Sequence, residues 1–230
     1  MAEMAMGYGS EFQLLRCLGH HRNALNSLIM EETGSESTID WLDYPIDLNR
    51  KSMDGELKGI ECFNEYFSPN RYKAIHKAWT AFWPGRGNAM NWDGIFIQNG
   101  VWYFVEAKAN VQEAYQKCEA SSPDSRNKIL AAFRATQNSF NLPEDENWID
   151  STCYQLANRL AFLHFCKSQG IDARLLYIGF VNGCGAKSVT SKEDWIKIWN
   201  DELSILGIPP GKLGALVFYI HPNCKTAELK

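Results

Sequence analysis

The segment from Asn91 to Lys108 constrains the fold more than any other part of this sequence. It consists of two runs rich in β-branched and aromatic residues, separated by Asn99-Gly100. Asn-Gly between two such runs is typical of a β-hairpin with a two-residue type I′ turn. We therefore expect an antiparallel hairpin in which Ile95 lies opposite Phe104.

The same hairpin register would bring two carboxylates face to face. It places Asp93 opposite Glu106, where Cβ atoms of cross-strand neighbours are roughly 5 Å apart and like charges destabilise each other. Lys108 is two residues beyond Glu106, so the strand period of two puts its ammonium on the same face. The sequence thus predicts a cluster of two acids and one base.

Such a cluster has the composition of a magnesium site. A hard divalent cation prefers a few carboxylate oxygens and keeps part of its water shell. Asp93 and Glu106 supply such oxygens, and the Ala107 carbonyl is a third donor. A cation there would activate water and neutralise phosphoryl charge, with Lys108 stabilising the developing negative charge. This chemistry is phosphodiester hydrolysis with Mg²⁺ or Mn²⁺. The alternative is a structural ion pair of Lys108 with Glu106 or Asp93.

Helical and strand periodicities organise the rest of the chain. An amphipathic helix over 52–67 carries Glu61, and the segment 73–83 is ambiguous between helix and strand. Further helices are expected at 11–30, from Ser122–Asp124 to about Phe140, from a cap at Asp150 or Ser151 to Gly170, and from a Thr190–Glu193 capping box to about Gly207. Strands are expected over 174–181 and 215–221, and 34–51 is expected to be a loop.

Composition indicates one intracellular domain. A chain of 230 residues with 45% hydrophobic content fills one core. It has no apolar run near the ~20 residues that span a bilayer and no secretory signal pattern, so we expect a cytoplasmic protein without membrane contact. The formal charge of −4 gives no overall basic footprint. The seven cysteines include no CxxC pair, so we expect reduced and mostly buried thiols.

With Asp93 followed by Glu106-Ala107-Lys108, the sequence resembles the PD-(D/E)XK nuclease superfamily. In that superfamily an Asp on one strand precedes Glu-x-Lys on the next, in a helix–strand–strand–strand–helix–strand order that fits residues 52–181. The resemblance implies an α/β, restriction-endonuclease-like fold: a central mixed sheet with an antiparallel hairpin core, flanked by helices. One domain would then cover residues 1–230, with an N-terminal helical extension and a C-terminal helix–strand extension. Trp92 stands where the motif name has proline.

By the same resemblance, Asp93 and Glu106 would be metal ligands and Lys108 catalytic. Glu61 would be an additional ligand, and Gln155 and Arg159 on the following helix would be outer-shell residues. The substrate would be nucleic acid, in the first instance DNA, and a homodimer enters consideration because restriction nucleases commonly dimerise. The sequence also resembles an uncharacterised bacterial protein family through Asn91-Trp-Asp, Glu106-Ala-Lys-Ala and residues 154–165, which implies no substrate.

Two other function classes stay open beside a DNA nuclease. One is a catalytically inactive nucleic-acid-binding or protein-interaction module on the same fold. The other is an RNA-directed or toxin-like nuclease. The segment 182–188 is a poor phosphate-binding loop, because the motif requires glycines at Val181 and Ala186. The histidines lack zinc-site spacing, and His164 is expected to be a satisfied core histidine.

Overall fold

The structure is a computed structural model that describes residues 9–42, 57–85, 90–183 and 189–225. It is an α/β fold with a five-stranded mixed sheet in the order β1-β4-β5-β6-β7. The strands of this sheet are β1 (Ile39–Trp41), β4 (Gly94–Gln98), β5 (Val101–Lys108), β6 (Ala173–Gly179) and β7 (Val217–Ile220). β1, β4 and β5 are antiparallel neighbours, whereas β5, β6 and β7 are parallel. A separate two-stranded sheet pairs β2 (Leu57–Lys58) with β3 (Asn91–Trp92).

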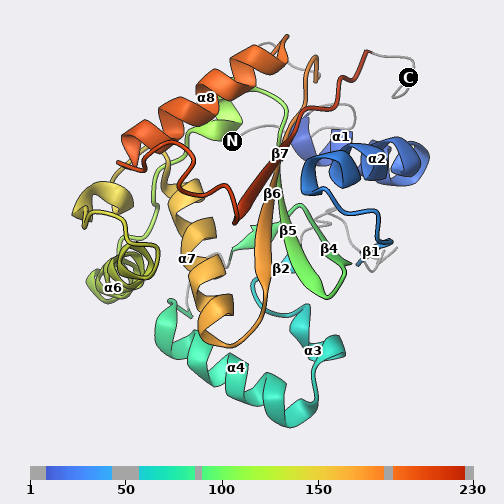
Figure 1. Cartoon of the computed structure of the whole chain (residues 1–230). Coiled ribbons are helices and arrows are strands. Elements are labelled where there is room, and N and C mark those ends of the chain that lie inside the picture. Colours follow the sequence, from blue (N-terminus) through green and yellow to red (C-terminus); the bar gives the residue numbers. More distant parts are fainter. Residues whose placement is uncertain (1–8, 43–56, 86–89, 184–188, 226–230) are drawn as a thin grey trace.

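Helices cover both faces of the five-stranded sheet (Figure 1). α7 lies against one face with α6 outside it, and α1 and α2 cover the other face. The helices are α1 (Gly9–His20), α2 (Arg22–Thr33), α3 (Phe63–Tyr66), α4 (Pro69–Phe82), α5 (Val111–Ala114), α6 (Pro123–Ser139), α7 (Tyr154–Ser168) and α8 (Lys192–Ile205), with a 3-10 turn at Glu146–Ile149. None of the helices in the described ranges is long and apolar enough to cross a bilayer.

The predicted hairpin is confirmed in β4 and β5. Ile95 pairs with Phe104, and Asn99 and Gly100 both have positive φ angles, of 51° and 76°, as a type I′ turn requires. Regular pairing stops at Gly94, however. The Asp93 N–H donates to the Val105 carbonyl (3.1 Å), so the chain bends one residue before β4. The expectation that Asp93 lies directly opposite Glu106 was therefore wrong, because the Asp93 N–H bonds to Val105, the residue before Glu106.

Several expected helix boundaries were wrong. The helix expected over 52–67 is strand β2 and a turn from 57 to 62, and only Phe63–Tyr66 is helical; residues 52–56 lie outside the described ranges. The helix expected over 11–30 divides at His21. The loop expected over 34–51 contains β1, with 43–51 outside the described ranges. The ambiguous segment 73–83 is helical up to Phe82, where α4 ends, and Trp83 is the cap residue.

Two expected caps were also displaced along the chain. Cys153 occupies the cap position of α7, without a side-chain bond, in place of Asp150 or Ser151. Ser191, whose hydroxyl accepts from the Asp194 N–H, caps α8 in place of Thr190. α6 begins at Pro123 with Ser122 as its cap residue, in agreement with the helix start expected at Ser122–Asp124. Displaced caps change the helix starts by a few residues and leave the order of elements intact.

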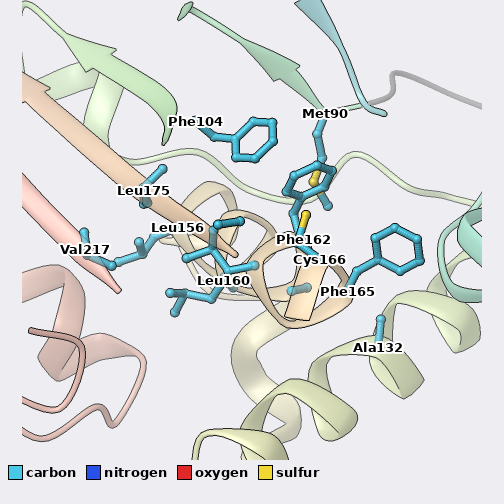
Figure 2. Close-up of a cluster of buried hydrophobic side chains, with 14 of the residues drawn as sticks. Met90, Phe104, Ala132, Leu156, Leu160, Phe162, Phe165, Cys166, Leu175 and Val217 are labelled. Carbon is cyan, nitrogen blue, oxygen red and sulfur yellow. The ribbon is translucent and has the colours of Figure 1, made fainter. Parts of the chain in front are cut away.

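Two apolar clusters sandwich the sheet. Side chains alternate along β5, so Trp102 and Phe104 face α7 while Tyr103 and Val105 face α1 and α2. Figure 2 shows the α7 side, where side chains of α7 meet those of the sheet and of α6. The labelled members are Met90, Phe104, Ala132, Leu156, Leu160, Phe162, Phe165, Cys166, Leu175 and Val217. The described cysteines form no disulfide, and all but the half-buried Cys118 are buried.

His164 departs from the expectation of a satisfied core histidine. It lies on α7 between the rings of Phe82 and Phe140, with centroid distances of 5.8 and 6.4 Å. Its Nδ1 is buried and has no hydrogen-bond partner among the described residues. Burial lowers the pKa of its imidazole, which favours the neutral ring that such packing requires.

Phe162 should be a principal stabilising residue of the α7 face. Its ring is fully buried and lies 4.7 Å from the ring of Phe104 and 4.8 Å from that of Trp92, centroid to centroid. Phe162→Ala should lower the free energy of unfolding by about 3–5 kcal/mol, measured by urea denaturation. Ile205→Ala, at a site 44% exposed, should change it by no more than about 0.5 kcal/mol. Equal effects of the two substitutions would contradict this account of the core.

Candidate functional site

The predicted acids and base meet at the carboxyl end of β5, beneath α7. Glu106 and Lys108 lie on the β5 face that carries Trp102 and Phe104, so they place two charges at the end of an otherwise apolar face. They are 3% and 4% exposed, and Arg159 of α7 is 5% exposed. Buried charges are costly unless they are paired and hydrogen-bonded. The arrangement of their partners therefore determines whether this end of the sheet is stable.

Glu106 is paired on both carboxylate oxygens. Lys108 Nζ donates to Oε1, and Arg159 Nε donates to Oε2 at 2.7 Å. Burial works to raise the pKa of Glu106, but the charges and hydrogen bonds of Arg159 and Lys108 outweigh it and lower the pKa. Glu106 is thus an ionised carboxylate with lone pairs to spare, because each oxygen can accept more than one bond.

α7 presents two side chains, one helical turn apart, to these two residues of the strand. Gln155 Oε1 accepts from Lys108 Nζ at 2.6 Å, and Arg159 reaches Glu106. Four residues of helix rise about 6 Å and two residues of strand rise about 6.7 Å, so the two spacings match. The order of the contacts shows that α7 runs antiparallel to β5. The sequence-based choice of Gln155 and Arg159 as residues around the site is consistent with these contacts.

Arg159 also holds the segment that precedes Asp93. Its Nη2 donates to the Asn91 carbonyl at 2.8 Å, and its guanidinium carbon lies 4.6 Å from the ring centroid of Trp92. Nη1 donates to Asn158 Oδ1 at 3.0 Å. One planar guanidinium therefore fixes both the strand that carries Glu106 and the residues just before Asp93.

Asp93 reaches the site from its bend rather than from a strand. Its Oδ2 accepts from the Ala107 N–H at 2.6 Å, and its side chain is half-buried. Burial and the nearby Glu106 carboxylate raise the pKa of Asp93 to about 8, against the lowering effects of Lys108, the Ala107 N–H and Arg159. At neutral pH Asp93 therefore holds a proton, and Lys108 and Arg159 give the cluster a net positive charge.

The backbone of Ala107 faces the same side as Asp93. The Trp102 N–H and the Lys108 carbonyl bond towards β6, whereas the Val105 carbonyl bonds to Asp93. Bonding directions alternate along a strand, so the Ala107 N–H and carbonyl both point towards the Asp93 side, beyond the end of β4. The three predicted oxygen donors therefore lie at the same end of β5, with Asp93 and the Ala107 carbonyl at its β4 side and Glu106 on its α7 face.

Glu61 does not lie on a helix beside this corner. It is exposed in the turn between β2 and α3, and the charges that act on Asp93 are those of Glu106, Lys108 and Arg159. Across the described ranges no three residues among the histidines, cysteines and acids gather closely enough to hold a metal ion. A cation here would have two carboxylates and a carbonyl, with the remaining positions left to water or substrate.

Sequence reasoning missed one acid of this neighbourhood, Glu202 on α8. It is 1% exposed and accepts from the Tyr177 hydroxyl at 3.1 Å. A signal for it existed: residue 202 continues the apolar stripe of α8 through Trp195, Ile198 and Leu206, all of which are buried. A charged residue on a core-facing stripe is unusual enough to mark a site candidate.

Comparison of the chain with protein-family models gave no match, and comparisons with curated proteins and with solved structures gave no significant one. What the protein does must therefore be inferred from the chemistry of this corner.

Proposed function

We propose that the protein is a metal-dependent nuclease that hydrolyses phosphodiester bonds, with DNA as the substrate. Asp93, Glu106 and the Ala107 carbonyl would hold a magnesium or manganese ion, and Lys108 would be the catalytic residue whose ammonium stabilises the developing negative charge beside it. The observation that carries the proposal is the placement of these donors at one end of β5, beside the buried Lys108 ammonium. A restriction-endonuclease-like fold is part of the same proposal, supported by the β4–β5 hairpin and the parallel β6 that follows α7.

The donor set fits magnesium better than a metal that needs a complete protein cage. Mg²⁺ is usually bound by one or two carboxylates, with water and substrate phosphate filling its other positions. When bound, the ion would supply a water of lowered pKa and neutralise charge on the phosphoryl group. While Asp93 is protonated, the cluster carries a net positive charge, which suits a cation that arrives together with a negatively charged phosphate.

The chain's own cations would act on the phosphate. Lys108 has three N–H donors, of which two are directed to Glu106 and Gln155, leaving the third for a phosphate oxygen. Gln155 and Asp93 are the half-buried members of the cluster, so the substrate would approach from their side. Arg159, fully engaged with Glu106, Asn91 and Asn158, would hold the acids in place.

A non-catalytic nucleic-acid-binding module is the second candidate, because Glu106 is already balanced by Lys108 and Arg159 without any ion. Such a module would bind DNA without a cation, and Asp93→Ala would not change that binding. An RNA-directed nuclease is distinguished by comparing RNA and DNA cleavage. A homodimer stays a prediction, which the molar mass in solution would test.

Cleavage should depend on Asp93. Wild type incubated with plasmid DNA and Mg²⁺ or Mn²⁺ should cut it, and Asp93→Asn should reduce the rate at least ~100-fold because a cation ligand is lost. Asp124→Asn, which changes an exposed acid of α6, is the matched control and should cut like wild type. Calorimetry should show cation binding that strengthens when DNA is present. If wild type neither binds a cation with DNA nor cuts it, the nuclease proposal is wrong.

Cation binding should also follow the proton on Asp93. The pKa of about 8 lies above the ordinary value of 3.8, so the proton stabilises the native state at acid pH, and this contribution is lost as the pH rises towards 8. A cation must displace that proton, so its affinity should rise about tenfold per pH unit between about pH 6 and 8 and then level off. Calorimetric titrations at several pH values measure this. A flat profile would show that Asp93 is not a ligand.

A further inference from the structure

Gln155, in the first turn of α7, has two polar groups, and the described part of the protein uses one of them. Its carbonyl oxygen Oε1 accepts a hydrogen bond from Lys108 Nζ at 2.6 Å. Its amide nitrogen Nε2 donates to none of the described residues, and it is not among their buried unpartnered atoms. Because a polar atom that is neither bonded nor buried reaches solvent, the Gln155 NH2 group is open to a ligand.

Lys108 fixes the orientation of this amide. An ammonium group has donors and no acceptor, so the atom of Gln155 that faces it must be the carbonyl oxygen. The opposite orientation would direct N–H groups at one another beside an ammonium that is almost completely buried, at 4% exposure. The Gln155 NH2 group is therefore held in one place by the hydrogen bond that its oxygen accepts.

The free N–H groups of Gln155 and Lys108 are close enough to bind one phosphate group. The oxygen and nitrogen of a carboxamide are about 2.2 Å apart, so Nε2 lies within about 5 Å of Nζ. One N–H bond of a planar carboxamide runs parallel to the C=O bond, so it points to the side on which Lys108 lies. Lys108 has a third N–H beyond those directed to Glu106 and Gln155. Glutamine and lysine side chains are both common donors to the phosphate oxygens of DNA.

The charges around these two donors favour an anion. The charged side chains that are at least nine-tenths buried here are Glu106, Lys108 and Arg159, which together carry one net positive charge. Asp93 adds no charge while it is protonated. A phosphodiester group carries one negative charge, which balances the cluster. A buried charge without a counter-charge is costly, so binding of such an anion is favourable.

We propose that Gln155 is a phosphate-binding residue, whose Nε2 donates to the same phosphodiester group that accepts a hydrogen bond from Lys108. The identity of the ligand as a DNA strand rests on the proposed nuclease function. Gln155 then has two roles, because its oxygen holds the Lys108 ammonium and its nitrogen contacts the substrate. A purely structural Gln155 would have the first role alone.

Two substitutions of Gln155 separate these roles. Gln155→Glu keeps an acceptor for Lys108 and removes the N–H donors, whereas Gln155→Met is similar in length and removes both. Each should weaken the binding of a fluorescent DNA oligonucleotide about tenfold, because a hydrogen bond to a charged group is lost. Fluorescence anisotropy in EDTA measures this without any metal ion. Wild-type affinity in Gln155→Glu would show that Gln155 serves only to hold Lys108, and would overturn the proposal.

Gln116→Glu is the matched control for the negative charge that Gln155→Glu introduces. Gln116 is exposed and lies beside the start of α7, where its carbonyl accepts from the Tyr154 N–H at 3.2 Å. Its side chain has no part in the Lys108 contacts, which go to Glu106 and Gln155. The affinity of this variant should stay within about threefold of wild type, because salt screens exposed charges. Equal losses in the two glutamate variants would mean that added charge explains the result, and the proposal would fall.

NMR spectroscopy of the wild-type protein tests the contact without a substitution. The side-chain NH2 signals of Gln155, assigned through bonds from its backbone, should shift when the oligonucleotide is added in EDTA. Inorganic phosphate at millimolar concentration should shift the same signals less, because it lacks the other contacts of a DNA strand. Signals that move with inorganic phosphate and not with DNA, or that move with neither, would overturn the proposal.

Cleavage assays distinguish this inference from the nuclease proposal. If wild type cuts plasmid DNA, Gln155→Glu and Gln155→Met should each lower kcat/KM about tenfold or more, and Gln116→Glu should stay within about threefold. Cleavage that is unchanged in both Gln155 variants would overturn the phosphate contact and leave the nuclease proposal standing. If wild type cuts no DNA, the nuclease proposal fails, and the metal-free binding and NMR results still decide the role of Gln155.

Discussion

The charge balance around Glu106 is the interaction on which this end of the structure depends. A carboxylate that is 3% exposed would be strongly destabilising without compensation, and here Lys108 and Arg159 compensate it from two different elements. One partner comes from the same strand and the other from α7. The packing of α7 on the sheet and the ionisation of Glu106 therefore require each other, and neither can be changed without cost to the other.

Different side chains of α7 contribute to the hydrophobic core and to the candidate site. Leu156, Leu160 and Phe162 pack against the sheet, while Gln155 and Arg159 meet the charged residues of β5. The apolar contacts fix the height and rotation of the helix, and that placement determines whether the polar contacts can form. Rigid packing in this way preorganises the polar groups, which is the general requirement for electrostatic catalysis.

Local signals in the sequence predicted the parts of the structure that local physics determines. The β4–β5 hairpin followed from Asn99-Gly100, and its face alternation placed Glu106 and Lys108 together. The bend at Asp93 could not be predicted, because it arises where β3 leaves to pair with the distant β2. β1 was missed for the same reason: it is a three-residue strand that exists only through its pairing with β4.

The helix boundaries and the outer part of the site show a second limit of sequence reasoning. α4 packs Tyr72, Trp79 and Phe82 against the core, and aromatic residues of this kind are equally typical of strands, so the local sequence left the segment ambiguous. Glu61 was placed on a helix because apolar residues recurred at helical spacing, yet several of those residues pack from a turn and a very short helix. Glu202 stood on the apolar stripe of α8, but its neighbour Tyr177 could be identified only once the sheet order was known.

The pairing of Glu106 with Lys108 and Arg159 also bears on whether folding of the protein requires a metal ion. Small zinc domains stay unfolded until metal arrives and are denatured by chelators, because their ligands repel one another or lack rigid support without the ion. In this chain Lys108 and Arg159 are the counter-ions of Glu106 once α7 packs against β5. The counter-charges of this carboxylate are therefore part of the chain itself, and we expect the sheet and α7 to stay assembled in a chelating buffer.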